Sequence, residues 1–366
     1  MGWDGARLKI LAQERGYTLI KLANLLDVSR QTVNDWIKGQ VPKGSHLIKL
    51  STTLDINPGY FFPNEVSGEI SVPLHRKRGV ARITLAMEQD SKQMAREYTN
   101  LFKFAPPPGL IPILRIINKD KKNAAEMAGQ IRSFAKLDAE KPMDYKYCFE
   151  LLANLKIIII FRNFPETVKG YAFYSKIYHQ RVVFVDNNTN VLDLIFPLLH
   201  ETIHSIRDEG NVIFYDQEEE SFCDSVASDV QFPIKYVELV YETIKGRPKS
   251  HQINHLKRFS AENGHSIFGI TQQLKKLDPS FDLNVGGPNA NLKKEFRSIG
   301  DILFAEQNAK CYIQNLKSLT PLFFGIVSNQ IENATTRKVA EWLSLESSID
   351  AGEVINEWKR SVSCNC

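Results

Sequence analysis

The sequence is poor in cysteine and contains no long hydrophobic run. Its 366 residues include only five cysteines, an odd number without a CxxC pair, which argues against a disulfide framework and fits a reducing compartment. The longest apolar run, residues 157–161, is far too short to span a bilayer. Charged residues close to the start interrupt any signal-peptide core. We therefore expect a cytoplasmic protein that has no contact with a membrane.

The chain also carries little net charge, and that charge is unevenly placed. All of the surplus of +4 falls in residues 1–80, which hold 11 basic and 7 acidic residues. A polyanionic partner is therefore expected at this end and not along the whole chain. A content of 43% hydrophobic and 24% charged residues excludes a wholly disordered, collagen-like or coiled-coil protein. The length predicts two or three domains.

Hydrophobic periodicity predicts an α+β protein that is mostly helical. Four short helices are expected within residues 5–63, and helices are again expected from residue 81 to 154. Three short segments rich in Ile, Val, Phe and Tyr then predict a small three-stranded sheet, at residues 156–162, 171–175 and 181–186. Two helices, at about 190–206 and 218–230, follow the sheet, and most of the remaining chain is predicted to be helical.

The most specific motif is an H-E-x-x-H at residues 200–204, on the first of these two helices. At about 100° per residue, His200 and His204 lie about 40° apart and one turn from each other, so both imidazoles can bind one metal ion from the same side. Glu201 falls near 100°, where it can act as a base on a metal-bound water. Pro197 should kink the helix just before these residues.

The following helix offers a third ligand. Zinc sites that catalyse reactions use three protein ligands and leave one position for water. We expect Glu220 to be that ligand, and Asp224, one turn further on the same face, to accept a proton from the free nitrogen of a ligating histidine. Glu218 or Glu219 could take the place of Glu220. The alternative interpretation is that both segments are only solvated polar helix faces.

These segments resemble the ImmA/IrrE family of zinc metallopeptidases, a zincin-like group, over about residues 125–235. The resemblance rests on F-P-L-L-H-E-T-I-H at residues 196–204, on E-S-F-C-D at residues 220–224, and on Ile131-Arg132, Leu151-Leu152, Ala227 and Pro233. It implies a zincin-like core that binds one Zn²⁺ per chain through His200, His204 and Glu220, with Glu201 as general base. The chain departs from the family pattern at Ile203, Cys223 and Val230-Gln231, none of which is an expected ligand.

Such a site would hydrolyse a peptide bond. Zn²⁺ lowers the pKa of its bound water to about 7 and polarises the scissile carbonyl. An extended substrate could pair with an edge of the small sheet, at its second or its third strand. The polar candidates for stabilising the oxyanion are Tyr174, Tyr178 and His179.

Residues 18–39 resemble the helix-turn-helix of the Cro/repressor (XRE) type, and the resemblance covers about residues 5–63. It implies that Asp27 makes the turn and that the second helix of the motif enters the major groove of double-stranded DNA. Arg30, Gln31 and Asn34 are of the types that read bases, and Thr32 and Lys38 are candidates for phosphate contacts. Because residues 1–63 carry only a small positive surplus, we expect a homodimer or help from the basic residues 76–78. The alternative is a helical module that contacts only proteins.

Together these patterns predict a DNA-binding, zinc-dependent endopeptidase. By the family resemblance, its substrate would be a regulatory protein, a helix-turn-helix repressor or an antitoxin, cut in a stress, phage or mobile-element response of a prokaryote. The alternative is a non-proteolytic transcription regulator or antitoxin whose protease-like domain senses a ligand or binds a partner. The expected division is a DNA-binding domain at 1–63, a linker at 64–80, a helical connector at 81–124, the metallopeptidase domain at 125–249 and a helical region of unassigned role at 250–366.

Overall fold

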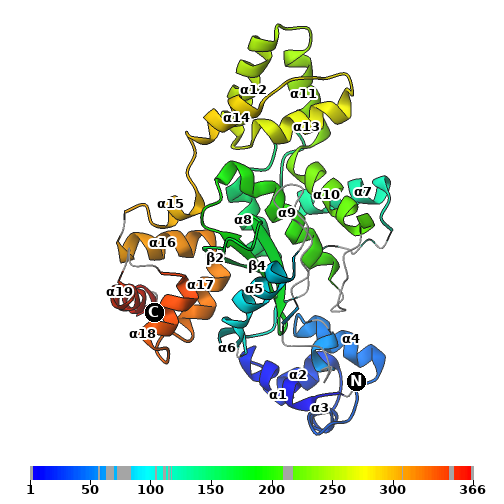
Figure 1. Cartoon of the computed structure of the whole chain (residues 1–366). Coiled ribbons are helices and arrows are strands. Elements are labelled where there is room, and N and C mark those ends of the chain that lie inside the picture. Colours follow the sequence, from blue (N-terminus) through cyan, green and yellow to red (C-terminus); the bar gives the residue numbers. More distant parts are fainter. Residues whose placement is uncertain are drawn as a thin grey trace.

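Helices predominate in the molecule, and they surround one small sheet near its middle (Figure 1). This arrangement confirms the expected mostly helical α+β class. Within the part of the chain that is described, no helix is both long and apolar enough to cross a membrane. The computed structural model describes residues 3–56, 58–62, 70–71, 84–103, 105–109, 113, 116, 118–208, 217–306, 308–345 and 350–363.

The N-terminal helices form a small domain with a core of its own. Oxygens of Asp4, Thr18 and Ser29 accept the first N–H groups of three of the helices and so fix where each begins. Asp27 takes the left-handed conformation, with φ of 57°, at the turn predicted for it. The elements are α1 (Gly5–Glu14), α2 (Leu19–Leu26), α3 (Arg30–Ile37), α4 (Gly44–Thr53) and a 3-10 turn η1 (Pro58–Phe61), and they bury Leu8, Leu22, Val33, Trp36 and Phe61.

The three predicted strands lie side by side in one sheet, in the order β3-β4-β2. β4 (Gln180–Asp186) lies between β2 (Ile157–Arg162), to which it is parallel, and β3 (Ala172–Ile177), to which it is antiparallel. These strands are almost wholly buried, as the predominance of apolar residues in them predicts.

A fourth strand was not expected. β1 (Ile70–Ser71) pairs with the end of β3, so part of the segment predicted as a linker belongs to the sheet. Two residues are too few to show a pattern of alternation, so this strand could not be predicted from hydrophobic periodicity. The basic residues 76–78 lie outside the described part of the chain.

Four helices cover the region that carries the H-E-x-x-H motif. α9 packs on β3 and β4, α8 packs on α9 and β2, and α10 packs on both α9 and α7. The buried guanidinium of Arg132 ties α7 to the end of α10, since it donates to the carbonyl oxygens of Val230, Asp138 and Lys141. The bounds are α7 (Lys121–Phe134), α8 (Tyr145–Asn154), α9 (Val191–Arg207) and α10 (Gln217–Gln231).

The helices after residue 233 contribute to two different cores. One group, drawn at the top of Figure 1, encloses a core that includes Phe232, Val240, Leu256 and Ile270: α11 (Ile234–Ile244), α12 (Lys249–Asn263), α13 (Ile267–Leu277) and α14 (Gly286–Lys293). The other group joins the core around the sheet: α15 (Ile299–Leu303), α16 (Ala309–Leu319), α17 (Pro321–Ser328), α18 (Thr336–Leu343) and α19 (Ala351–Ser363), with α5 (Leu85–Arg96) and α6 (Thr99–Phe102).

The N-terminal domain contacts the turn between β3 and β4. Nη1 of Arg7 lies 2.9 Å from Nε2 of His179, and the rings of Tyr60 and His179 meet edge to face. Burial, with the nearby charges of Arg7 and Lys176, lowers the pKa of His179 to about 4, so its neutral ring accepts the bond from Arg7. His179 therefore contributes to a domain contact.

Candidate metal centre

α9 runs without interruption through the motif. Asn190 caps its first turn by accepting from the N–H of Leu192. Pro197 lies inside the helix, which continues for ten residues beyond it to Arg207. Nearly the whole helix is buried, because one stripe of it faces the sheet and the other side faces α8 and α10. His200, Glu201 and His204 are consequently 0%, 1% and 3% exposed.

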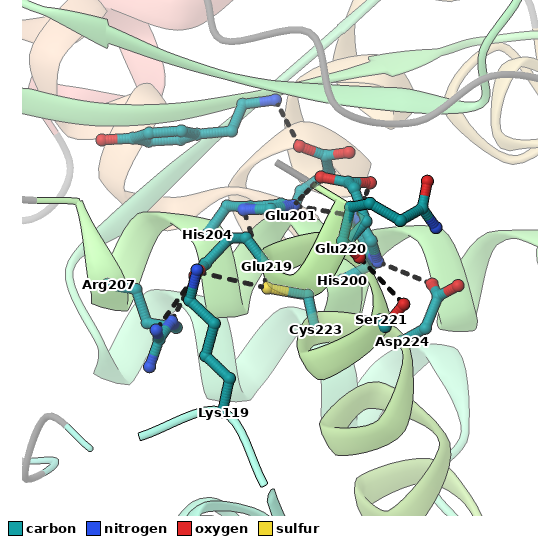
Figure 2. A network of polar contacts seen from close by, with 12 residues as sticks. Lys119, His200, Glu201, His204, Arg207, Glu219, Glu220, Ser221, Cys223 and Asp224 are labelled. Atoms are coloured by element: carbon teal, nitrogen blue, oxygen red, sulfur yellow. Dashed lines mark hydrogen bonds and ion pairs between the residues drawn. The ribbon is translucent and has the colours of Figure 1, made fainter. Parts of the chain in front are cut away.

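Three potential metal ligands converge between α9 and α10 (Figure 2). The Nε2 atoms of His200 and His204 lie 3.0 Å apart. Oε2 of Glu220 lies 3.4 Å from Nε2 of His200, and its Oε1 lies 3.2 Å from Nε2 of His204. All three residues are buried.

These separations fit a single small cation. Ligand atoms bound tetrahedrally at about 2.0–2.1 Å from zinc stand about 3.3 Å from one another, close to the three distances observed. The groups also suit a cation chemically, since two imidazoles and a carboxylate buried together need a positive charge to compensate them. His200, His204 and Glu220 can therefore hold one divalent metal ion.

The other nitrogen of each histidine also has a partner. Oδ1 of Asp224 lies 2.9 Å from Nδ1 of His200, as expected of a carboxylate that orients a ligating imidazole. Sγ of Cys223 lies 3.6 Å from Nδ1 of His204, and 3.8 Å from Oε1 of Glu219. The thiol contact was not predicted. Only the i, i+4 spacing of Glu219 and Cys223 on one helix could have indicated that they lie together.

The structure distinguishes among the three glutamates that could have supplied the third ligand. Glu218 is exposed. Glu219 forms ion pairs with Arg207 and Lys119, which lower the pKa of its carboxyl group although burial opposes them. His204, Glu219 and Cys223 also lie close enough together to bind a metal. The charge of Glu219 is already compensated, so the cluster that contains Glu220 is the better site.

Glu201 lies beside the cluster and connects it to the sheet. Its Oε2 accepts a hydrogen bond of 2.8 Å from the backbone N–H of Tyr174 in β3. The hydroxyl of Tyr174 donates to Asp208, 2.7 Å away. The main chain of one strand thus holds the carboxylate that follows the first histidine.

The site favours positive charge. Burial lowers the pKa of His200, but its contacts with Asp224 and Glu220, together with the charge of Glu201, outweigh burial and raise it to about 9. At neutral pH and without a metal, a proton on His200 therefore provides the positive charge that the surrounding carboxylates require.

The residues expected to contact DNA lie together on one helix. The structure places Arg30, Gln31 and Lys38 at exposed positions and leaves Thr32 and Asn34 half-buried, along α3 or at its end. The side chain of Gln31 donates to Asp35, and that of Thr32 contacts Ser29. Figure 1 shows α3 at the outer end of the molecule, away from the sheet.

Comparison with known proteins identifies this first domain. Residues 8–61 match the model of a family described as helix-turn-helix. The N-terminal domain is a helix-turn-helix module. A module of this family indicates a DNA-binding regulator. No curated protein and no solved structure matches the chain.

The pKa of His200 predicts how metal binding depends on pH. A metal must displace the proton that His200 holds below about pH 9, so the apparent affinity should rise about tenfold per pH unit between about pH 6 and 8. Competition with a chromophoric chelator measures this dependence. The exposed His251 lies outside the site, and His251→Gln should leave it unchanged. An affinity that is constant over this interval would contradict the assignment.

The contact between Asp224 and His200 predicts a loss of metal affinity on substitution. Asp224→Asn should weaken metal binding about 10- to 100-fold, because the neutral amide no longer orients His200 as a ligand. Asp229→Asn, on the same helix but outside the cluster, is the matched control. Equal affinities for the two variants would show that Asp224 has no such role.

Proposed function

We propose that the protein is a DNA-binding, zinc-dependent endopeptidase of the ImmA/IrrE type, with a zincin-like core. The observation that supports this most directly is the cluster of His200, His204 and Glu220, whose spacings fit one tetrahedral ion. Two histidines and a glutamate form the ligand set of a class of catalytic zinc sites, in which a fourth position remains for water.

Glu201 would act as the general base. Zn²⁺ held by these residues would supply a water ligand with a pKa near 7 and would polarise the carbonyl group of the substrate. Glu201 would accept the proton lost by the water oxygen when that oxygen bonds to the carbonyl carbon, and would pass this proton to the amine nitrogen as the C–N bond breaks. The bond from the Tyr174 N–H keeps this carboxylate beside the cluster.

The substrate chain would pair with β3. Of the two candidate strands, β4 pairs along its length with both β2 and β3, whereas β3 pairs along its length only with β4 and has β1 on its other side. Among the described residues, β1 pairs with the outer edge of β3 only at Lys176 and Ile177. The rest of this edge lies next to Glu201, where an extended peptide would bring a carbonyl group to the site.

The helix-turn-helix module would place the enzyme on DNA. Arg30, Gln31 and Asn34 have the donors and acceptors that read bases, and Thr32 and Lys38 would contact phosphates. The substrate we propose is a regulatory protein, a repressor or antitoxin bound or encoded nearby. A homodimer on a two-fold symmetric operator would supplement the modest charge of the module.

Substitution of Glu201 tests the catalytic proposal. Glu201→Gln should retain the metal and lose hydrolysis, because the amide keeps the size of the side chain but takes up no proton. The exposed Glu218→Gln on the neighbouring helix is the control and should cleave as the unaltered protein does. The assay follows chelator-sensitive cleavage of the proteins encoded beside the gene. Cleavage by Glu201→Gln at the unaltered rate would refute the mechanism.

The same assay separates the enzyme from a non-proteolytic regulator. A regulator or antitoxin with a protease-like domain would bind its partner without cleaving it, whether or not metal is present. A metal that is only structural would leave cleavage absent while chelation unfolds the protein.

DNA binding is tested on α3. Asn34→Ala should weaken binding to the operator about 5- to 100-fold, since one base contact contributes about 1–3 kcal/mol. Lys38→Ala should weaken binding to all sequences alike and reduce the salt dependence by about one charge. The exposed Lys9→Ala on α1 is the control. Equal effects of all three substitutions in a binding titration would exclude α3 as the reading helix.

A further inference from the structure

A large cavity lies next to the metal cluster. Its volume is about 720 Å³, which is in the range of pockets that bind ligands. The start of β3 and parts of α9, α10, α13 and α14 line it. The cavity therefore joins the region of the motif to the helices after residue 233, for which the sequence indicated no function.

The cavity adjoins the candidate metal centre on the side of Asp224. Asp224 lines it and at the same time contacts Nδ1 of His200. Phe196 lines it from the turn of α9 that precedes His200, with the two rings 6.5 Å apart. A group bound in the cavity would thus lie beside the ligands of the cluster.

Within the described part of the chain, the edge of β3 before Lys176 pairs with no other strand, and this edge leads toward the same cavity. The carbonyl of Tyr171 accepts from Asp186 on the side of β4, whereas the N–H of Tyr174 points to the other side, toward Glu201. Since backbone groups alternate along a strand, those of Ala172 face the same edge as the N–H of Tyr174. Residues 170–172 also line the cavity. A peptide paired with this edge would therefore extend from Glu201 into the cavity.

The walls of the cavity combine large apolar side chains with serine, glutamine and charged side chains. Leu192, Phe196, Phe232 and Phe268 contribute to them. Phe268 on α13 is 56% exposed, so an apolar ligand in the cavity would remove part of its apolar surface from water.

Among the charges in the cavity, one cation lacks a close partner. Asp193 is paired with Lys293 at 2.5 Å, and Asp224 contacts His200. No carboxylate in the described part of the chain lies within ion-pair distance of Lys276, although Asp229 feels its charge. The cavity thus presents an apolar surface with a positive charge at one side.

We propose that this cavity is the specificity pocket of the protein, and that it receives a large apolar side chain of an extended protein segment together with a neighbouring acidic side chain that faces Lys276. The assignment rests on the proposed function, since it takes the peptide from the edge of β3 to be the substrate. It gives α13 the role of selecting which segment is cleaved.

The test uses peptide selection on the full-length chain. Randomised peptides displayed on phage are selected on the Glu201→Gln protein in the presence of Zn²⁺, so that bound peptides are not consumed. The same selection is made in the presence of a second substitution: Lys276→Glu, Phe268→Ala or, as the matched control on the same helix, Lys275→Glu. Lys275 is exposed and does not line the cavity.

We expect peptides with a large apolar residue next to Asp or Glu. Lys276→Glu should weaken their binding about three- to fivefold and replace the acidic residue by Lys or Arg in the selected set. Phe268→Ala should weaken binding about tenfold. Lys275→Glu should select the same peptides as the parent protein. Failure to enrich any peptide, or enrichment that is indifferent to residues 268 and 276, would overturn the proposal.

A second measurement separates this proposal from that of hydrolysis. The selected peptides are synthesised and incubated with the protein that retains Glu201. If the peptides bind with the expected preference and remain intact, the result supports the specificity pocket and refutes the proposal that the protein is an endopeptidase. If they are cleaved with no dependence on residues 268 and 276, the endopeptidase stands and the pocket is refuted.

Discussion

The burial of two imidazoles and two carboxylates in one place is the constraint on which the centre of this molecule depends. His200, Glu201, His204 and Glu220 are each less than 10% exposed. Buried groups of this kind are stable only when hydrogen bonds and opposite charges compensate them. The proton on His200 compensates part of the negative charge of the buried carboxylates, and a divalent ion would compensate more of it. The packing of α9 on α10 must therefore be accurate to a fraction of an ångström.

Two arginines on either side of the cluster help to hold α10 in place. Arg132 on α7 donates to the carbonyl of Val230 near the end of α10 and to those of Asp138 and Lys141, which follow α7. At the other end of the interface, Arg207 on α9 forms an ion pair with Glu219 on α10 and lies over the ring of Phe222. Each arginine is buried and fully engaged, so removing either would leave unpaired polar groups inside the protein. Along α10, the contacts of these two arginines lie on either side of Glu220.

The sequence predicted most of this site because its elements are local. The spacing of His200 and His204 needs only the helical repeat to place both rings together, and the run of three glutamates on the next helix predicted a carboxylate nearby. Which glutamate faces the histidines could not be predicted, since it depends on how α10 is rotated about its own axis. The contacts of Arg207 and Lys119 with Glu219 could not be predicted either, because they join side chains from three separate segments that share no sequence pattern. Only the i, i+4 spacing indicated the contact of Cys223 with Glu219.

The contact between the helix-turn-helix domain and the sheet could not be predicted from the sequence either. This contact affects how DNA binding and the candidate metal centre could be connected. The helix-turn-helix contacts the β3–β4 turn through Arg7 and Tyr60, on α1 and η1. β3 also carries the Tyr174 N–H that holds Glu201. Helix α3, the proposed reading helix, lies at the outer end of the molecule, and the α11–α14 group lies at the opposite end (Figure 1). DNA on α3 and a protein segment at β3 would therefore approach different faces, and one strand would connect the domain contact to the carboxylate of the candidate centre.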